Sequence, residues 1–194
     1  MSEVQVDQEM REAKRKSAKP MLWVSLISMV MFFAGLTSAY IISATREDWV
    51  VFDLPQAFYI STLFIILSSA ALFLSQSFLK KDDLKKSMMF LIATFVLGLA
   101  FVWYQYVGFK ELESLGLYFT GPKSTVSTSF VIGITFIHVL HLLAGIVVLI
   151  VVIYNHFKKK YSSANMLGFE LGAIFWHFVD LVWILLFLFF KFYK

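Results

Sequence analysis

Five ionisable side chains stand inside otherwise apolar stretches and are the residues of this sequence best suited to chemistry. They are His138, His141, Glu170, His177 and Asp180. Histidine ligates haem iron and other metals and exchanges protons near neutral pH, and carboxylates bind metals and relay protons. Three kinds of site are therefore open: a haem held by two histidines, a metal site that includes Asp180, and a proton path along Glu170, His177 and Asp180.

Residue spacing groups these side chains on helix faces. Glu170 and His177 are seven residues apart, which on a helix returns to within about 20° of the same direction. Asp180 follows His177 by three residues, so the two side chains can touch. His138 and His141 lie on one helix and cannot hold opposite faces of one iron, whereas either of them could do so with His177.

The elements that position these residues are membrane helices. Of 194 residues, 59% are hydrophobic and 15% are charged, whereas a soluble domain has about 25% charged residues. Roughly 20 apolar residues cross a bilayer as a helix. The apolar segments predict an all-α bundle of five transmembrane helices, at about residues 21–45, 55–79, 87–109, 126–155 and 168–191. Residues 1–20 are expected to be a polar cytoplasmic tail, and residues 21–194 a single transmembrane domain.

The charge distribution and the cysteine content indicate the membrane orientation and exclude several kinds of site. Five lysine and arginine residues lie in the N-terminal tail, four at residues 80–86 and three at residues 158–160. Only five lie on the opposite side of the predicted membrane. The positive-inside rule then places the N-terminus inside and the C-terminus outside. The absence of cysteine excludes thiolate metal sites and iron–sulfur clusters. No basic stripe is interleaved with aromatic residues, so no nucleic-acid partner is expected.

A structural role competes with the three chemical roles. Polar side chains between helices in lipid form hydrogen bonds worth about 0.6–2 kcal/mol each. At about 1.5 Å per residue, His141 lies roughly 20 Å, and His177 and Asp180 about 14–18 Å, from the loop between the last two segments. These depths predict a polar layer between the fourth and fifth helices, with His138 in the same layer and Glu170 nearer the inner surface.

The last helix carries a recognisable motif. The run GFELGAIFWHFVDLVWILLF (residues 168–187) resembles the closing helix of subunit III of the haem–copper terminal oxidases, in its short five-helix bacterial form. FIHVLHLLAG (136–145), VMFFAG (30–35) and the weaker LSS (67–69) resemble other elements of that family. The matching positions of the last helix are Glu170, Trp176, His177, Phe178, Val179, Asp180 and Trp183.

The sequence also departs from the family pattern. Met29 stands where the family commonly has a buried glutamate, and Ser77 and Phe78 stand where a histidine pair often follows LSS. Longer members have seven helices, and the first two have no counterpart here. A role for the missing glutamate is therefore not carried over.

The resemblance implies a non-catalytic subunit without haem, copper or another metal of its own. Its histidines and carboxylates would be structural or electrostatic, in a polar layer that includes Trp176 and Trp183 on the same helix. Expected partners are oxidase subunits I and II, which hold the haems and copper, and membrane phospholipids. The complex would reduce oxygen to water and translocate protons across a bacterial inner membrane. Subunit III would support assembly, proton uptake and durability of subunit I.

Several alternatives stay open. The electron donor is expected to be cytochrome c, with quinol as the alternative, and membership of a larger respiratory supercomplex is undecided. A stand-alone b-type membrane cytochrome would use His177 and a histidine of the fourth helix as axial ligands. A small proton channel would use the intramembrane carboxylates and histidines.

Overall fold

The computed structural model describes residues 3–121, 124–163 and 165–193. Over these ranges the only β-structure is an isolated bridge between Ser162 and Asn165. The five helices are α1 (Glu3–Ser43), α2 (Gln56–Lys80), α3 (Leu84–Ser114), α4 (Val126–Phe157) and α5 (Leu167–Phe192). All five are long and apolar enough to span a membrane, which confirms the predicted all-α membrane bundle.

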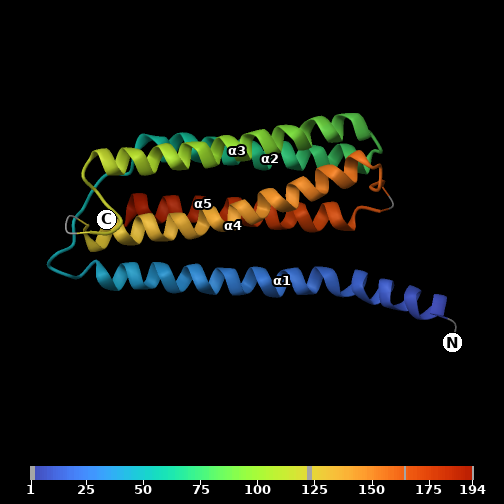
Figure 1. Ribbon diagram of the computed structural model, residues 1–194, viewed down its shortest axis with the longest axis horizontal. Coiled ribbons are helices and arrows are strands. Elements are labelled where there is room, and N and C mark those ends of the chain that lie inside the picture. Colours follow the sequence, from blue (N-terminus) through green and yellow to red (C-terminus); the bar gives the residue numbers. More distant parts are fainter. Residues whose placement is uncertain (1–2, 122–123, 164, 194) are drawn as a thin grey trace.

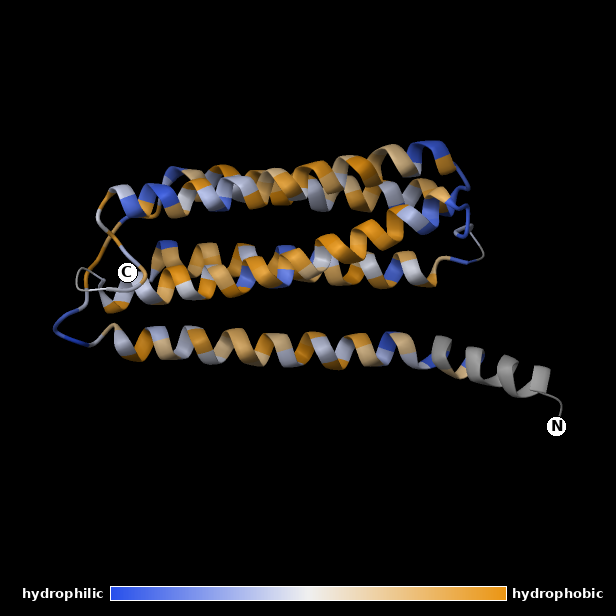
Figure 2. Ribbon diagram, in the orientation of Figure 1, coloured by the Kyte–Doolittle hydropathy of each residue, from blue (hydrophilic) through white to orange (hydrophobic). Residues whose placement is uncertain are grey.

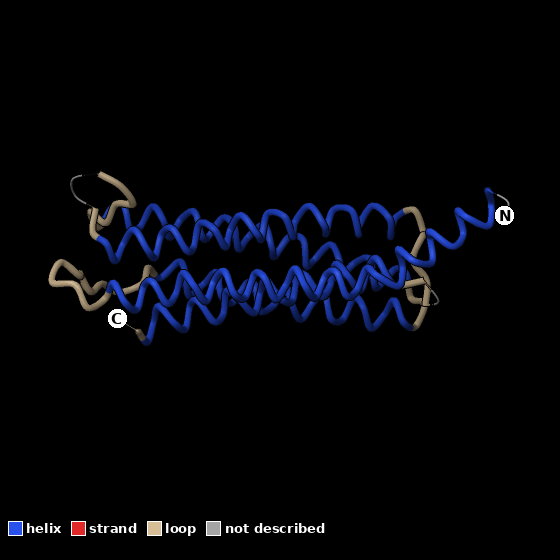
Figure 3. The backbone as a smooth tube through the Cα atoms, turned by 90° about the horizontal axis from the view of Figure 1, so that it is seen from below, coloured by secondary structure: helices blue, strands red, loops and turns tan. Residues whose placement is uncertain are grey.

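The helices run nearly parallel to one long axis (Figures 1 and 3). α2 packs on α3 and α4 packs on α5, while α1 contacts only α4 and α5 within the described part of the chain. The N-terminus lies at the same end as the α2–α3 and α4–α5 turns, and the C-terminus lies at the opposite end. Hydrophilic residues gather at the two ends of the bundle and hydrophobic residues fill its middle (Figure 2).

Two helices are longer than the sequence predicted. Residues 3–20, expected to be a polar tail, form the first part of α1, which continues through Pro20. α3 ends at Ser114 instead of about residue 109, because no helix breaker precedes Gly116, whose φ is 76°. Lys110 and Glu113 also pair across one turn of α3 at 2.7 Å. Lys123 and Lys194, counted among the cations of the outer side, lie outside the described residues.

Side-chain caps begin two of the helices. Thr125 and Thr128 form a reciprocal capping box at the start of α4. Asp83 accepts a hydrogen bond of 3.1 Å from the Lys86 amide at the start of α3. These caps let the short connections end abruptly and the apolar helices begin at once.

The core centres on α5. Trp176 and Trp183 are almost fully buried, together with Phe101 of α3. Trp176 fits only because glycines face it: a Cβ at Gly98 of α3 would lie 2.7 Å from Trp176 Cη2, and one at Gly145 of α4 would lie 3.2 Å from Trp176 Cε3. The face of α5 that carries Trp176 thereby packs closely against α3 and α4.

Candidate functional site

α5 carries most of the residues singled out from the sequence, and α2 is the helix that most of them contact. Trp176 Nε1 donates a hydrogen bond of 3.1 Å to Ser68 Oγ, and Trp183 Nε1 donates one of 2.9 Å to Thr62 Oγ1. His177 Nδ1 and Ser69 Oγ share a hydrogen bond of 2.5 Å. We call this set the α2–α5 hydroxyl seam; its members are Thr62, Ser68, Ser69, Trp176, His177 and Trp183.

The seam is continued into α3. Ser68 Oγ donates to the Thr94 carbonyl oxygen at 3.1 Å, while accepting from the indole of Trp176. Further toward the other end of the bundle, Gln105 Nε2 donates to Ser61 Oγ at 3.1 Å. Both Ser68 and Thr94 are fully buried. Small hydroxyl side chains thus link three helices in a region where water cannot supply the hydrogen bonds.

His138 is the one predicted polar-layer residue that bonds from α4 to α5. It is fully buried, and its Nε2 lies 3.1 Å from the carbonyl oxygen of Val179. A carbonyl only accepts, so Nε2 carries the proton and the ring is held as that tautomer. The ring packs against Trp183 and Phe101, with centroid separations of 5.2 and 6.1 Å.

His141 faces α1 instead. Its Nδ1 lies 2.9 Å from the carbonyl oxygen of Ile137 in its own helix. Its ring packs on Phe33, with the centroids 5.5 Å apart. His141 therefore connects α4 to α1 by packing.

The two carboxylates of α5 have different surroundings. Asp180 is 2% exposed, and neither of its oxygens has a hydrogen-bond partner of good geometry among the described residues. Ser69 is the polar neighbour that interacts with this carboxyl. Glu170 lies nearer the end of the bundle, where its Oε2 is 2.6 Å from Lys19 Nζ of α1. The five residues expected to meet between α4 and α5 therefore have contact partners on α1, α2, α4 and α5.

This distribution bears on haem and metal chemistry. His138 is engaged by the α5 backbone, and His177 by a hydroxyl of α2, so the two rings are held by separate partners. Residues 3–121, 124–163 and 165–193 contain no cluster of three or more potential metal ligands. The geometry seen is that of side chains that fasten helices to one another.

The sequence did not indicate a second polar contact, which lies at the end of the bundle that carries the α2–α3 turn and the α4–α5 loop (Figure 1). His156 of α4 is 4% exposed, and its Nε2 lies 3.0 Å from Ser87 Oγ of α3. Ser75 Oγ of α2 donates to the Ser87 carbonyl oxygen at 2.7 Å. The position of His156 directly after a long apolar run could have indicated a buried histidine. Its closeness to the lysines at residues 158–160 suggested a loop residue instead.

The connecting loops at that end are joined as well. Asp82 of the α2–α3 turn accepts hydrogen bonds from Ser163 of the α4–α5 loop, 2.6 Å from Ser163 Oγ and 2.8 Å from its amide. These hydrogen bonds hold the pKa of the Asp82 carboxyl below its usual value. The α2–α3 turn and the α4–α5 loop, both flanked by lysines, are thereby brought together.

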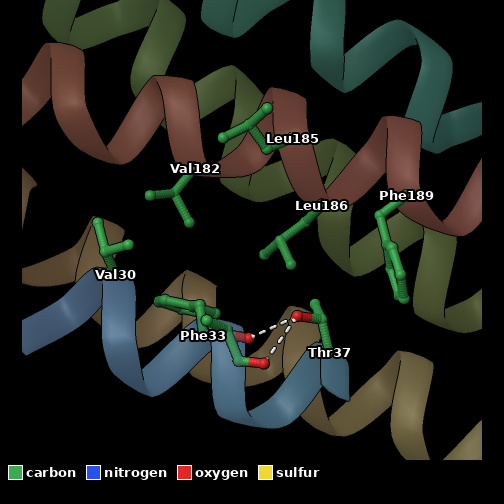
Figure 4. Close-up of a pocket in the computed structure, with 8 residues that line it drawn as sticks. Val30, Phe33, Thr37, Val182, Leu185, Leu186 and Phe189 are labelled. Carbon is green, nitrogen blue, oxygen red and sulfur yellow. Dashed lines mark hydrogen bonds between the residues drawn. The ribbon is translucent and has the colours of Figure 1, made fainter. Parts of the chain in front are cut away.

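A pocket of about 300 Å³ opens between α1 and α5 (Figure 4). Its labelled walls are apolar except for Thr37, whose hydroxyl bonds back to the carbonyl oxygens of Phe33 and Ala34 in α1. The remaining lining residues are Val30, Val182, Leu185, Leu186 and Phe189. An apolar pocket thus separates α1 from α5 along this stretch.

Comparison with known proteins gives a consistent result. A family model described as cytochrome c oxidase subunit III matches residues 2–194. Cytochrome c oxidase subunit 3 of Thermostichus vulcanus is 30% identical over 86% of this chain and 82% of its own length. Cytochrome bo(3) ubiquinol oxidase subunit 3 of Buchnera aphidicola subsp. Schizaphis graminum is 27% identical over 92% and 95%. The wheat (Triticum aestivum) cytochrome c oxidase subunit 3 is 28% identical over 84% of this chain but 63% of its own length.

Proposed function

Because the chain belongs to the cytochrome c oxidase subunit III family, we propose that it is the non-catalytic third subunit of a respiratory haem–copper oxidase that reduces oxygen to water. The observation that carries this proposal is the family match over residues 2–194. Subunits III of this family carry no cofactor of their own and associate with a haem–copper oxidase complex. The partners proposed here are subunits I and II and membrane phospholipids.

The contacts between helices favour a structural role within the complex. The indoles of Trp176 and Trp183 and the imidazoles of His138 and His177 all bond across helix interfaces. Such contacts stabilise a bundle in lipid, where the hydrophobic effect does not hold helices together. The subunit would then present a firm lateral surface to the oxygen-reducing subunit and support its assembly, proton uptake and durability.

The electron donor is proposed to be cytochrome c, with quinol as the second candidate. The quinol alternative has a specific observation in its favour. The ubiquinol oxidase relative is matched over 95% of its own length, so the two chains are of similar extent. Donor specificity would reside on other subunits in either case.

The protein is a multi-pass membrane protein, and we propose the bacterial inner membrane as its location. The N-terminus, the α2–α3 turn and the α4–α5 loop lie at one end of the bundle (Figure 1). Lysines at positions 80, 81, 85, 86 and 158–160 belong to that end. The positive-inside rule supports placing this end in the cytoplasm and the C-terminus outside.

The test of the proposed function is purification of the tagged chain from membranes in mild detergent, followed by mass spectrometry. Recovery of a large subunit with haem–copper histidine ligands, together with a second subunit, is expected. Recovery of the chain alone would contradict the proposal. A Soret absorption band in the chain purified alone would instead support a b-type cytochrome, and proton flux through the reconstituted chain would support a channel.

A further inference from the structure

The end of the bundle that carries the α2–α3 turn and the α4–α5 loop is strongly basic. Two carboxylates, Asp82 and Asp83, lie in these two connections. The lysines of the same connections are all exposed; they are Lys80, Lys81, Lys85, Lys86, Lys158, Lys159 and Lys160. Cations therefore dominate this surface.

Both carboxylates are already engaged. Asp82 accepts hydrogen bonds of 2.6 Å from Ser163 Oγ and 2.8 Å from its amide. Asp83 accepts a hydrogen bond of 3.1 Å from the Lys86 amide, and its Oδ2 lies 3.1 Å from Lys86 Nζ. The described residues offer no ion-pair partner to five of the other lysines, which are Lys80, Lys81, Lys85, Lys159 and Lys160. These five cations are available to a ligand.

Two internal contacts hold the two groups of lysines near one another. The hydrogen bonds between Asp82 and Ser163 join the α2–α3 turn to the α4–α5 loop. His156 Nε2, close to the end of α4, lies 3.0 Å from Ser87 Oγ, close to the start of α3. The positive-inside rule accounts for lysines in both connections but requires no contact between the connections. Cations that are held together before a ligand arrives bind it at a smaller entropy cost.

Exposed apolar side chains lie next to these lysines on the membrane side. Phe157 and Tyr154 of α4 are 75% and 56% exposed, and Met89, one turn after Lys85 on α3, is 59% exposed. The apolar spans of α2 and α4 end at Lys80 and Phe157. The lysines that follow therefore lie at the level of the lipid headgroups, a layer about 5–8 Å thick on each side of the bilayer. An acidic soluble protein could pair with the lysines but would leave the apolar side chains uncovered.

We propose that residues 80–86 and 158–163 form a binding surface for an anionic phospholipid, which we call the basic platform. The phosphodiester of the lipid would contact the free lysines, and its acyl chains would cover Met89, Tyr154 and Phe157. A zwitterionic headgroup carries a cation of its own, so the platform favours a headgroup with net negative charge. The inference selects one class among the phospholipid partners of the proposed function. It depends on the membrane bundle and not on the oxidase, so a chain without oxidase subunits would leave it standing.

Native mass spectrometry of the full chain, with any subunits that co-purify, tests the proposal. The protein is reconstituted in nanodiscs that contain equal amounts of phosphatidylglycerol and phosphatidylcholine with identical acyl chains, so that the two lipids differ only in the headgroup. After release from the nanodiscs, the unmodified chain is expected to retain phosphatidylglycerol in preference to phosphatidylcholine. Equal retention of the two lipids would overturn the proposal.

A charge-matched pair of variants tests the location. The double variant Lys81→Gln and Lys159→Gln removes one free cation from each connection, and the preference for phosphatidylglycerol is expected to fall about 5-fold for each lysine removed. The control, Lys16→Gln and Lys110→Gln, removes the same charge at exposed positions outside the platform and is expected to keep the preference. Equal losses in the two double variants would show that only the net charge matters and would contradict the platform.

Asp82→Asn separates a built surface from diffuse attraction. The variant raises the net positive charge by one while it weakens the contact with Ser163. Diffuse attraction predicts a stronger preference for phosphatidylglycerol, whereas the platform predicts a weaker one, because the two connections are no longer held together. A stronger preference would overturn the proposal.

Inorganic phosphate distinguishes a lipid headgroup from a free anion. At constant ionic strength, an excess of inorganic phosphate is expected to leave the phosphatidylglycerol bound, because phosphate has no acyl chains to cover the apolar side chains. Displacement of the lipid by phosphate would assign the lysines to a free anion and contradict a lipid site.

Discussion

At the scale of single residues, the position of each polar side chain depends on which neighbour accepts or donates its hydrogen bond. The two indoles of α5 each donate to a hydroxyl of α2, and His138 donates to a backbone carbonyl. Asp180 differs, since the described residues offer its oxygens no hydrogen bond of good geometry. A carboxyl in that position contributes little to the cohesion of the isolated subunit, because burial of a polar group without hydrogen bonds of good geometry opposes folding.

Asp180→Asn is the variant that tests this statement. Asparagine keeps the shape and removes the charge, so we expect the subunit to accumulate in membranes at least as well as the unmodified chain. Quantitative immunoblotting of the membranes measures the accumulation. A strong loss would show that the charge itself is required, through a partner that the isolated chain does not supply.

At the scale of helices, close approach depends on glycine. Gly98 of α3 faces the indole of Trp176 so closely that a Cβ would lie 2.7 Å from Cη2. Gly35 of α1 has no atom within 4 Å of the same position. The two glycines therefore have different roles, although both lie in apolar helices.

Gly98→Ala is expected to destabilise the bundle by about 1–3 kcal/mol, because the buried indole has no free space to move into. Gly35→Ala is the matched control and is expected to be neutral or slightly stabilising, since alanine favours helix more than glycine does. The midpoint of thermal unfolding in detergent compares the two variants. Equal midpoints would show that Trp176 does not need Gly98.

The loops between helices supply a pH-dependent contact. Ser163 holds the pKa of Asp82 below its usual value of 3.8. A lowered folded-state pKa means that the contact contributes its full stabilisation above pH 3.8 and loses it as the pH falls further.

We expect the Ser163 amide to be protected from hydrogen exchange above this pH and to lose protection below it. Asp82→Asn should reduce the protection above this pH to about the level that the unmodified chain shows below it, and should remove most of its pH dependence. Hydrogen exchange measured by mass spectrometry follows the loop peptide, after correction for the intrinsic pH dependence of exchange. The same pH profile in the variant would exclude Asp82 as the cause.

At the scale of the whole molecule, α1 is the least embedded helix. Of its most apolar window, 17% of the residues are buried, against 50% for α5. Its contacts include the Lys19–Glu170 ion pair, Phe33 against His141, and Tyr40 among aromatic rings near the C-terminal end of α1. The ion pair is partly exposed and contributes at most about 1 kcal/mol. α1 is therefore held chiefly by its few buried side chains, Leu26, Phe33 and Tyr40.

The orientation of the whole bundle is open to a direct test, because the chain contains no cysteine. Single cysteines are introduced as Ser114→Cys at the end of α3 and Ser162→Cys in the α4–α5 loop, both exposed positions. A membrane-impermeant maleimide added to intact cells with a permeabilised outer membrane is expected to label the Ser114→Cys variant and not the Ser162→Cys variant. Lysis should make both reactive. The reverse labelling would place the N-terminus outside.

The sequence by itself determined the features that depend on local composition. Five apolar segments predict five membrane helices because span length is set by the thickness of the bilayer. The motif around Trp176, His177 and Asp180 indicated the family, which the match over residues 2–194 supports. Helix ends were less predictable, as α1 and α3 show, because a charged segment can continue a helix into water.

Only the tertiary structure decided which helices these residues join. The spacing of His177 and Asp180 indicated a shared face of α5, but it contained no information on the neighbour, which is α2 and not the expected α4. The hydroxyls of Thr62 and Ser68 showed their importance only through the indoles that they bind. The physical reason is that lipid is as apolar as the helices, so hydrophobicity directs a segment into the membrane without selecting its partner. Close packing and individual hydrogen bonds make that selection.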